Sequence, residues 1–123
     1  MDFNPAELAQ LLEKKYPEIL IAYIFGSAKN GFVKANSDID LAVLLDDNCD
    51  KFIQFKIAVE LEKFYNCKVD TVVLNSANPL LIHEVMQKGN RLFERNSAKR
   101  AMFEVNAFRD FVDSSYFLRR RYA

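Results

Sequence analysis

The sequence predicts an α/β (α+β) fold in which a small mixed β-sheet is flanked by helices. Two observations carry this prediction. Three short apolar runs end at glycine or at polar residues, a pattern typical of buried strands. The segments around these runs repeat apolar residues every three or four positions, as amphipathic helices do. Strands and helices therefore alternate along the chain, which indicates a sheet with helices on at least one face.

The N-terminal segment predicts a helix followed by a buried strand. Asn4 is a favourable N-cap, and Pro5 suits the first helical position. Pro17 ends the helix, because the residue before a proline disfavours helical backbone angles. The run Ile19–Phe25 is short and rich in isoleucine and aromatic residues, which favours a strand over a helix.

The middle of the chain predicts two further strands joined by a helix. A polar segment before them, residues 28–37, is expected to form a helical turn and a loop. The expected elements are a strand (38–45), a helix (50–65) and a third strand (68–74). Phe52 and Phe55 are expected to widen the apolar face of the helix.

The C-terminal part predicts a helix, a short edge strand and a last helix. Asn78 and Pro79 begin the first of these by the same capping logic, and Gly89 is expected to stop it. Residues 91–94 are too few for more than an edge strand. The last helix is expected from Ser97 onward.

Composition narrows the class of protein. The 123 residues are expected to form one domain, residues 1–123, whose C-terminal helix and basic tail begin near residue 97. Basic and acidic residues balance at 17 each, so no overall positive field favours nucleic-acid binding. No apolar run reaches the length of a membrane span and the N-terminus lacks signal-peptide features, which predicts a cytoplasmic protein. Cys49 and Cys67 lack a metal-binding spacing and are expected to be reduced thiols.

Two aspartates open the second predicted strand, ten residues after a Gly-Ser turn. Asp38 and Asp40 lie two positions apart, so on a strand their side chains share one face. Two such carboxylates repel each other unless a cation lies between them, and Mg²⁺ prefers oxygen ligands of this kind together with substrate phosphates. Gly26 and Ser27 can offer backbone N–H groups to a phosphate. The pattern predicts a metal-nucleotide site.

Asp70 is the expected third acid of this site. It lies in an otherwise apolar strand, where a buried carboxylate is costly unless it is paired or bound to metal. Transfer of a phosphorus-centred group with two metal ions uses acids in this arrangement. Plainer interpretations stay open: Asp38 as a turn residue, Asp70 as an ion-pair partner of Lys68 or Arg91, and the Gly-Ser pair as an ordinary turn.

These residues carry a resemblance to a known family. With Gly26-Ser27, Asp38-Ile39-Asp40 and Asp70, the chain resembles the minimal nucleotidyltransferases of the DNA polymerase β superfamily. Within that superfamily it is most similar to the MntA-like antitoxins that are paired with HEPN-domain toxins. The likeness extends through residues 78–81 and 89–94. The resemblance implies the nucleotidyltransferase fold in its minimal form, without an added substrate domain.

The resemblance also implies a role for each residue of the motif. Gly26 and Ser27 would hold the nucleotide triphosphate, with ATP as the substrate. Asp38 and Asp40 would bind two Mg²⁺ ions. Asp70 would complete the metal shell and help to take the proton from the acceptor hydroxyl. The implied reaction moves AMP from ATP to a tyrosine hydroxyl of the cognate HEPN RNase toxin, which silences the toxin.

One departure from the family pattern bears on the nucleotide. Many relatives carry arginine directly after the serine, whereas this chain has Ala28. Lys29 or Lys34 would then supply the positive charge. Lysine is a point charge without the fork of arginine, so nucleotide affinity and base choice are left open.

Two other functions are compatible with the same residues. A binding-only antitoxin would cover its toxin without using the acids. A transferase acting on a small molecule would need more chain to enclose its acceptor, which argues against that function. Modification of a HEPN partner by the wild type but not by Asp38→Ala separates catalysis from binding alone.

Three features outside the motif have their own interpretations. His83 is expected to be a structural residue, because the metal mechanism needs no histidine. The basic residues Arg119–Arg121 are expected to face solvent or a partner rather than nucleic acid. The last helix carries more aromatic residues than one buried face requires, and such a surplus is typical of an interface with the toxin or with a second copy.

Overall fold

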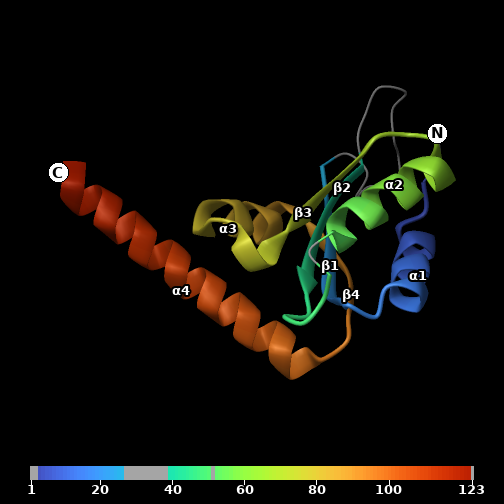
Figure 1. Cartoon of the computed structure of the whole chain (residues 1–123). Helices are drawn as coiled ribbons and strands as arrows, with labels where there is room; N and C mark the ends of the chain where they lie inside the picture. Colours follow the sequence, from blue (N-terminus) through green and yellow to red (C-terminus); the bar gives the residue numbers. More distant parts are fainter. Residues whose placement is uncertain (1–2, 27–38, 51, 123) are drawn as a thin grey trace.

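The chain folds into a mixed four-stranded sheet that lies between two layers of helices (Figure 1). The computed structural model describes residues 3–26, 39–50 and 52–122, with the backbone alone for residues 115–122. The elements are α1 (Pro5–Lys15), β1 (Ile19–Phe25), β2 (Ile39–Leu45), α2 (Ile53–Tyr65), β3 (Val69–Val73), the 3₁₀ turn η2 (Leu74–Ser76), α3 (Pro79–Lys88), β4 (Asn90–Glu94) and α4 (Ser97–Tyr122). The predicted fold class is confirmed.

The sheet has the strand order β3-β2-β1-β4. β1 pairs antiparallel with both β2 and β4, whereas β2 and β3 run parallel. The parallel pair needs a crossover connection, and α2 supplies it. β4 pairs with β1 alone among the described strands, which confirms the expected edge strand. The turn and loop expected at residues 28–37 lie outside the described residues.

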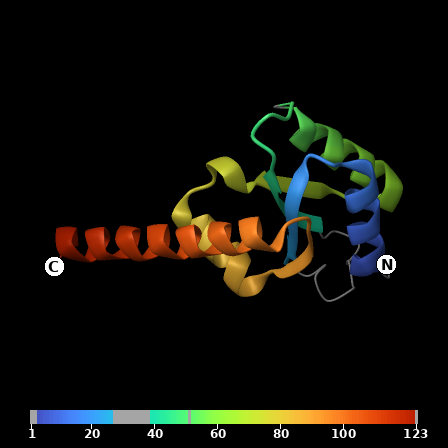
Figure 2. The same ribbon diagram turned by 90° about the horizontal axis from the view of Figure 1, so that it is seen from below.

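Each face of the sheet has its own hydrophobic core. α1 and α2 cover one face, where Leu8, Leu12, Ile57 and Leu61 pack against alternate strand residues such as Leu41. α3 and α4 cover the other face, where Ile82, Val85 and Ala107 pack against Ile21, Tyr23 and Ala42. Figures 1 and 2 show these two helix pairs on opposite sides of the strands. The strands are therefore buried on both faces, which explains their near-continuous apolar sequences.

The aromatic residues at the start of α2 do not join its buried face. Ile53, Ile57 and Leu61 are buried, whereas the exposed fractions of Phe52 and Phe55 are 66% and 58%. At 3.6 residues per turn, these two phenylalanines lie on the side of the helix opposite the buried stripe. The expectation that they widen the apolar face was wrong.

Helix capping follows the sequence signals at three positions. The Asn4 side chain accepts a hydrogen bond from the N–H of Ala6, and Asn78 accepts one from the N–H of Leu81. Gly89 ends α3 as expected, but its backbone is extended rather than left-handed. A Cβ at Gly89 would lie 2.5 Å from the carbonyl oxygen of Val85 and 3.1 Å from that of Ile24. Close approach of the chain to β1, and not a positive φ, therefore requires glycine here.

The helices and the two cysteines bear on the expected location and thiol chemistry of the protein. Among the described residues, no helix combines the length and the hydropathy that crossing a membrane requires. Cys49 and Cys67 are half-buried free thiols, as expected.

Candidate active site

Two of the three predicted acids face each other across neighbouring strands. Asp40 on β2 and Asp70 on β3 are register partners in the parallel pair, and adjacent strands lie about 5 Å apart. Alternation along a strand places Asp40 on the same face as Ala42, and Asp70 on the same face as Val72. Both of these apolar residues pack in the core under α3 and α4. The two carboxylates therefore project from one face of the sheet, as the motif predicts.

Gly26, directly after β1, lies against the Asp40 carboxylate. Phe25 is the register partner of Asp40 on the antiparallel side, so Gly26 follows directly beside that carboxylate. Gly26 has φ +73°, a left-handed backbone that favours glycine. A Cβ built on Gly26 would clash with Oδ2 of Asp40. Phe25, Asp40 and Asp70 thus form a row across β1, β2 and β3, and the Gly26 backbone lies next to the central carboxylate, that of Asp40.

The remaining motif residues lie outside the part of the chain that the structure describes. These are Ser27 and Asp38, together with Ala28, Lys29 and Lys34. Their roles stay predictions.

Asp70 is exposed, contrary to the expectation that it is buried in its strand. We expected a carboxylate within a buried strand, but β3 lies at the edge of the sheet in the described order. The alternative ion pair with Arg91 is not formed, because Arg91 lies 4.0 Å from Glu94 and 3.7 Å from Glu104. No salt bridge to Asp70 is found within the described residues. The Asp70 carboxylate at this edge is therefore accessible to solvent.

The donor set at this site fits a magnesium ion. Asp40 and Asp70 supply carboxylate oxygens from one face, the ligand type that Mg²⁺ prefers. Because Gly26 has no side chain, no Cβ fills the space beside Asp40. Within residues 3–26, 39–50 and 52–122, no three acidic, cysteine or histidine side chains converge on one point. Asp38, the remaining expected ligand, lies outside those residues.

A polar network that the sequence analysis missed anchors α4 to the same face of the sheet. The Tyr23 hydroxyl donates to Oε1 of Glu104 over 2.9 Å, and Nη1 of Arg100 lies 3.3 Å from Oε2 of the same carboxylate. Nε of Arg100 also donates to Glu94 on β4. Burial, followed by the hydrogen bond to Glu104, raises the pKa of Tyr23 far above its usual value. The signal in the sequence was a tyrosine hydroxyl within the apolar run of β1.

His83 packs between the helices that cover this face. Its ring stacks on Phe111 with 3.6 Å between ring centroids and 2° between the ring planes. The contact joins α3 to α4 and supports the structural role expected for this histidine.

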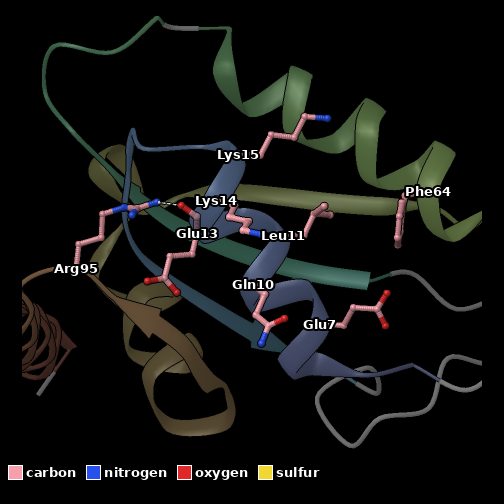
Figure 3. A pocket seen from close by; sticks show the side chains of 8 residues that line it. All are labelled: Glu7, Gln10, Leu11, Glu13, Lys14, Lys15, Phe64 and Arg95. Carbon is pink, nitrogen blue, oxygen red and sulfur yellow. Dashed lines mark hydrogen bonds between the residues drawn. The ribbon is translucent and has the colours of Figure 1, made fainter.

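A separate hollow in the described part of the chain lies on the other side of the molecule. It has a volume of about 1000 Å³ and lies beside α1, which covers the sheet face opposite the carboxylates. Figure 3 shows Arg95 at one end of it and Phe64 at the other. The Arg95 guanidinium donates to the carbonyl oxygens of Glu13, Tyr16 and Ile19. Arg95 thus joins α1 to β1. Because the hollow lies on the face opposite the carboxylates, it is not part of the candidate site.

Comparison with known proteins agrees with this geometry. Residues 6–98 match the family described as Polymerase beta, Nucleotidyltransferase. A curated relative, the protein adenylyltransferase MntA of Shewanella oneidensis, is 34% identical over 90 residues. That match covers 73% of this chain and 65% of the relative, so the chain spans slightly less than two thirds of the relative's length.

Two solved structures resemble the chain over nearly its whole length. One is a mutant of the toxin-antitoxin MntA-HpeT, with a TM-score of 0.77 and 26% identity. The other is a toxin-antitoxin with AMP-PNP, with a TM-score of 0.76 and 27% identity. Each match covers 98% of this chain and 100% of the other. The family match over most of the chain and the shared fold lead to one conclusion: the chain belongs to the polymerase beta nucleotidyltransferase family.

Proposed function

We propose that this protein is a Mg²⁺-dependent nucleotidyltransferase that moves AMP from ATP to a tyrosine hydroxyl of a cognate HEPN toxin, for which it acts as the antitoxin. The observation that carries the proposal is the pairing of Asp40 with Asp70 beside the backbone of Gly26. The curated name of the MntA relative supports protein adenylylation, and the related toxin-antitoxin with AMP-PNP supports ATP as the nucleotide.

The chain's own residues divide the work of the reaction. Gly26 and Ser27 would offer backbone N–H groups to the triphosphate. Asp38, Asp40 and Asp70 would hold the metal ions. Mg²⁺, when bound, supplies positive charge that offsets the charge of the triphosphate and of the departing pyrophosphate.

The position of Asp70 suits the acceptor side of the reaction. It is exposed on an edge strand, whereas Asp40 is half-buried in the middle of the row. A tyrosine of a partner protein can therefore approach Asp70 without entering the molecule. At this position the Asp70 carboxylate can accept the proton that the attacking hydroxyl loses.

The test uses the full chain, ATP, Mg²⁺ and a HEPN partner, with the intact mass of the partner as readout. We expect the wild type to add one or more AMP-sized masses. We expect Asp40→Asn and Asp70→Asn each to reduce the rate at least about 100-fold, the scale of losing a catalytic electrostatic or acid-base group. Asp47→Asn is the matched control, because Asp47 is exposed just beyond the opposite end of β2.

Binding of the partner is measured in parallel. If neither the wild type nor Asp47→Asn modifies the partner while every variant still binds it, the binding-only function replaces this proposal. Equal losses in Asp47→Asn and Asp70→Asn would also contradict it.

A further inference from the structure

Lys88, the last residue of α3, lies at the end of the sheet that carries the two acids. β2 and β4 both run antiparallel to β1, so the start of β4 lies at the same end as Asp40, near the start of β2. A Cβ built on Gly89, directly after Lys88, would lie 3.5 Å from Cβ of Phe25. Phe25 is the register partner of Asp40, which places Gly89 two strand spacings, roughly 10 Å, from Asp40.

The side of α3 that carries Lys88 is turned away from α4. His83 stacks on Phe111 of α4, and at 3.6 residues per turn Lys88 lies about 140° around the helix from His83. α4 follows the far end of β4, so its first turns lie at the end of the sheet opposite Asp40. Figure 1 shows α3 above α4 in that view. The Lys88 flank therefore faces the end of the sheet where the acids lie.

The Lys88 side chain is accessible. It is 73% exposed, and its Nζ lies 3.9 Å from Oε1 of Glu84, whose side chain is 57% exposed. An exposed ion pair of this length contributes little to stability, so it does not fix the ammonium against a more highly charged group. The neighbouring arginines are engaged with other acids, because Arg91 and Arg100 both lie against Glu94 and Glu104.

The order of residues across the sheet assigns an end of the nucleotide to this lysine. Asp70, Asp40, Phe25 and Gly89 follow one another from β3 to the start of β4. The exposed Asp70 lies on the side where the acceptor approaches in the proposed function. In transfer of a phosphorus-centred group the attacking and leaving oxygens lie roughly in line, so the leaving pyrophosphate points away from the acceptor. That direction leads from Asp40 towards Lys88.

We propose that Lys88 binds the β- and γ-phosphates of the nucleotide, the part that leaves as pyrophosphate. This assignment rests on the proposed transferase function. A lysine suits the role, because its ammonium is a compact charge on a flexible four-carbon stem and binds phosphate as a point charge. Lys88 then supplies positive charge that is absent at Ala28, from a distant segment of the chain.

Binding of two nucleotides to the full chain tests this role without the transfer reaction. Isothermal titration calorimetry with Mg²⁺ and no partner compares AMP-PNP, which has all three phosphate positions, with AMP, which has one. Lys88→Ala is expected to weaken AMP-PNP at least about tenfold and to leave AMP unchanged, since only the outer phosphates lose a charged contact. Lys88→Arg keeps the charge and should bind AMP-PNP within about threefold of the wild type.

Lys56→Ala is the matched control. Lys56 is also an exposed lysine with a long ion pair, 3.6 Å to Asp50, but it lies on α2, which covers the opposite face of the sheet. Its AMP-PNP affinity should equal that of the wild type. Wild-type affinity in Lys88→Ala, or equal weakening of AMP and AMP-PNP, overturns the proposal, and so does an arginine variant as weak as the alanine one.

Thermal melting separates this role from a structural one. A lysine in the last turn of a helix also offsets the helix dipole. A lower melting temperature of Lys88→Ala with unchanged AMP-PNP affinity would assign Lys88 to helix stability alone and overturn the proposal. A wild type that binds no AMP-PNP contradicts both this proposal and the transferase function. A wild type that binds AMP-PNP through Lys88 but modifies no partner contradicts only the transferase function.

Discussion

The α-carbon of Gly26 lies directly against the carboxylate of Asp40, so close that a methyl group on it would overlap Oδ2. The backbone of Gly26 and the Asp40 carboxylate on β2 are therefore packed closely together. The position of the carboxylate depends on the absence of a side chain at residue 26.

Replacing Gly26 with alanine tests this fit. The variant adopts a left-handed backbone with a Cβ, which costs about 1–2 kcal/mol, and the new methyl group also displaces Asp40. We expect both stability in urea and transferase activity to fall. Asn66→Ala is the control. Asn66 also has a left-handed backbone, with φ 52°, but it caps the end of α2 and is not part of the sheet. Comparable activity losses in the two variants would refute the specific contact.

Replacing Tyr65 with phenylalanine tests the alkaline stability of the protein. Burial raises the pKa of Tyr65 to about 12 from 10.0, so the folded state favours the neutral phenol. The resulting stability is complete below pH 10 and declines as the pH rises from 10 towards 12. Tyr65→Phe removes this ionisation and should flatten the decline measured by urea unfolding. A residual decline is expected, because burial also raises the pKa of Tyr16 and Tyr23.

Replacing Thr71 with valine tests a buried hydroxyl on β3. Thr71 is 5% exposed, and its Oγ1 has no hydrogen-bond partner among the described residues. Valine keeps the shape and removes the unpaired polar group, so the free energy of unfolding should rise by about 1 kcal/mol. Thr71→Ser keeps the hydroxyl but loses a methyl group and should lower it. A destabilised valine variant would mean that a partner for Oγ1 exists.

Replacing Arg95 with lysine tests the junction between α1 and β1. The Arg95 guanidinium donates hydrogen bonds to the carbonyl oxygens of Glu13, Tyr16 and Ile19. The ammonium group of lysine lacks this planar arrangement of donors and cannot form all three bonds. We expect a loss of about 1–3 kcal/mol in the free energy of unfolding. Arg91→Lys is the control, since its exposed ion pairs at 3.7 and 4.0 Å contribute little. Equal losses would show that the three carbonyl contacts do not matter.

The local sequence predicted most elements within a few residues of their observed ends. Caps at Asn4 and Asn78 are local signals, since an asparagine side chain reaches only the next turn of backbone. The end of α3 at Gly89 was predicted correctly, but from the general preference for glycine at helix ends. The structure shows that glycine is required there because β1 approaches it closely, and this tertiary contact leaves no local signal. Phe52 and Phe55 are exposed although they are strongly apolar, because the helical period places them opposite Ile57.

The candidate site divides in the same way. The sequence predicted which face of its strand each acid lies on, because side chains alternate between the two faces along a strand. The exposure of Asp70 did not, because it depends on β3 being an edge strand. The hydrogen bond from Tyr23 to Glu104 joins residues 81 positions apart. Its only sign in the sequence is a polar hydroxyl within an apolar strand.

By itself, the sequence determined the order of helices and strands, the apolar face of most helices and the acids available for chemistry. Those properties depend on neighbours along the chain. Only the tertiary structure decided that β2 lies between β1 and β3, that Asp40 is opposite Asp70, and that the Gly26 backbone lies against the Asp40 carboxylate. Strand order and register arise from contacts between distant segments, and no local period encodes them.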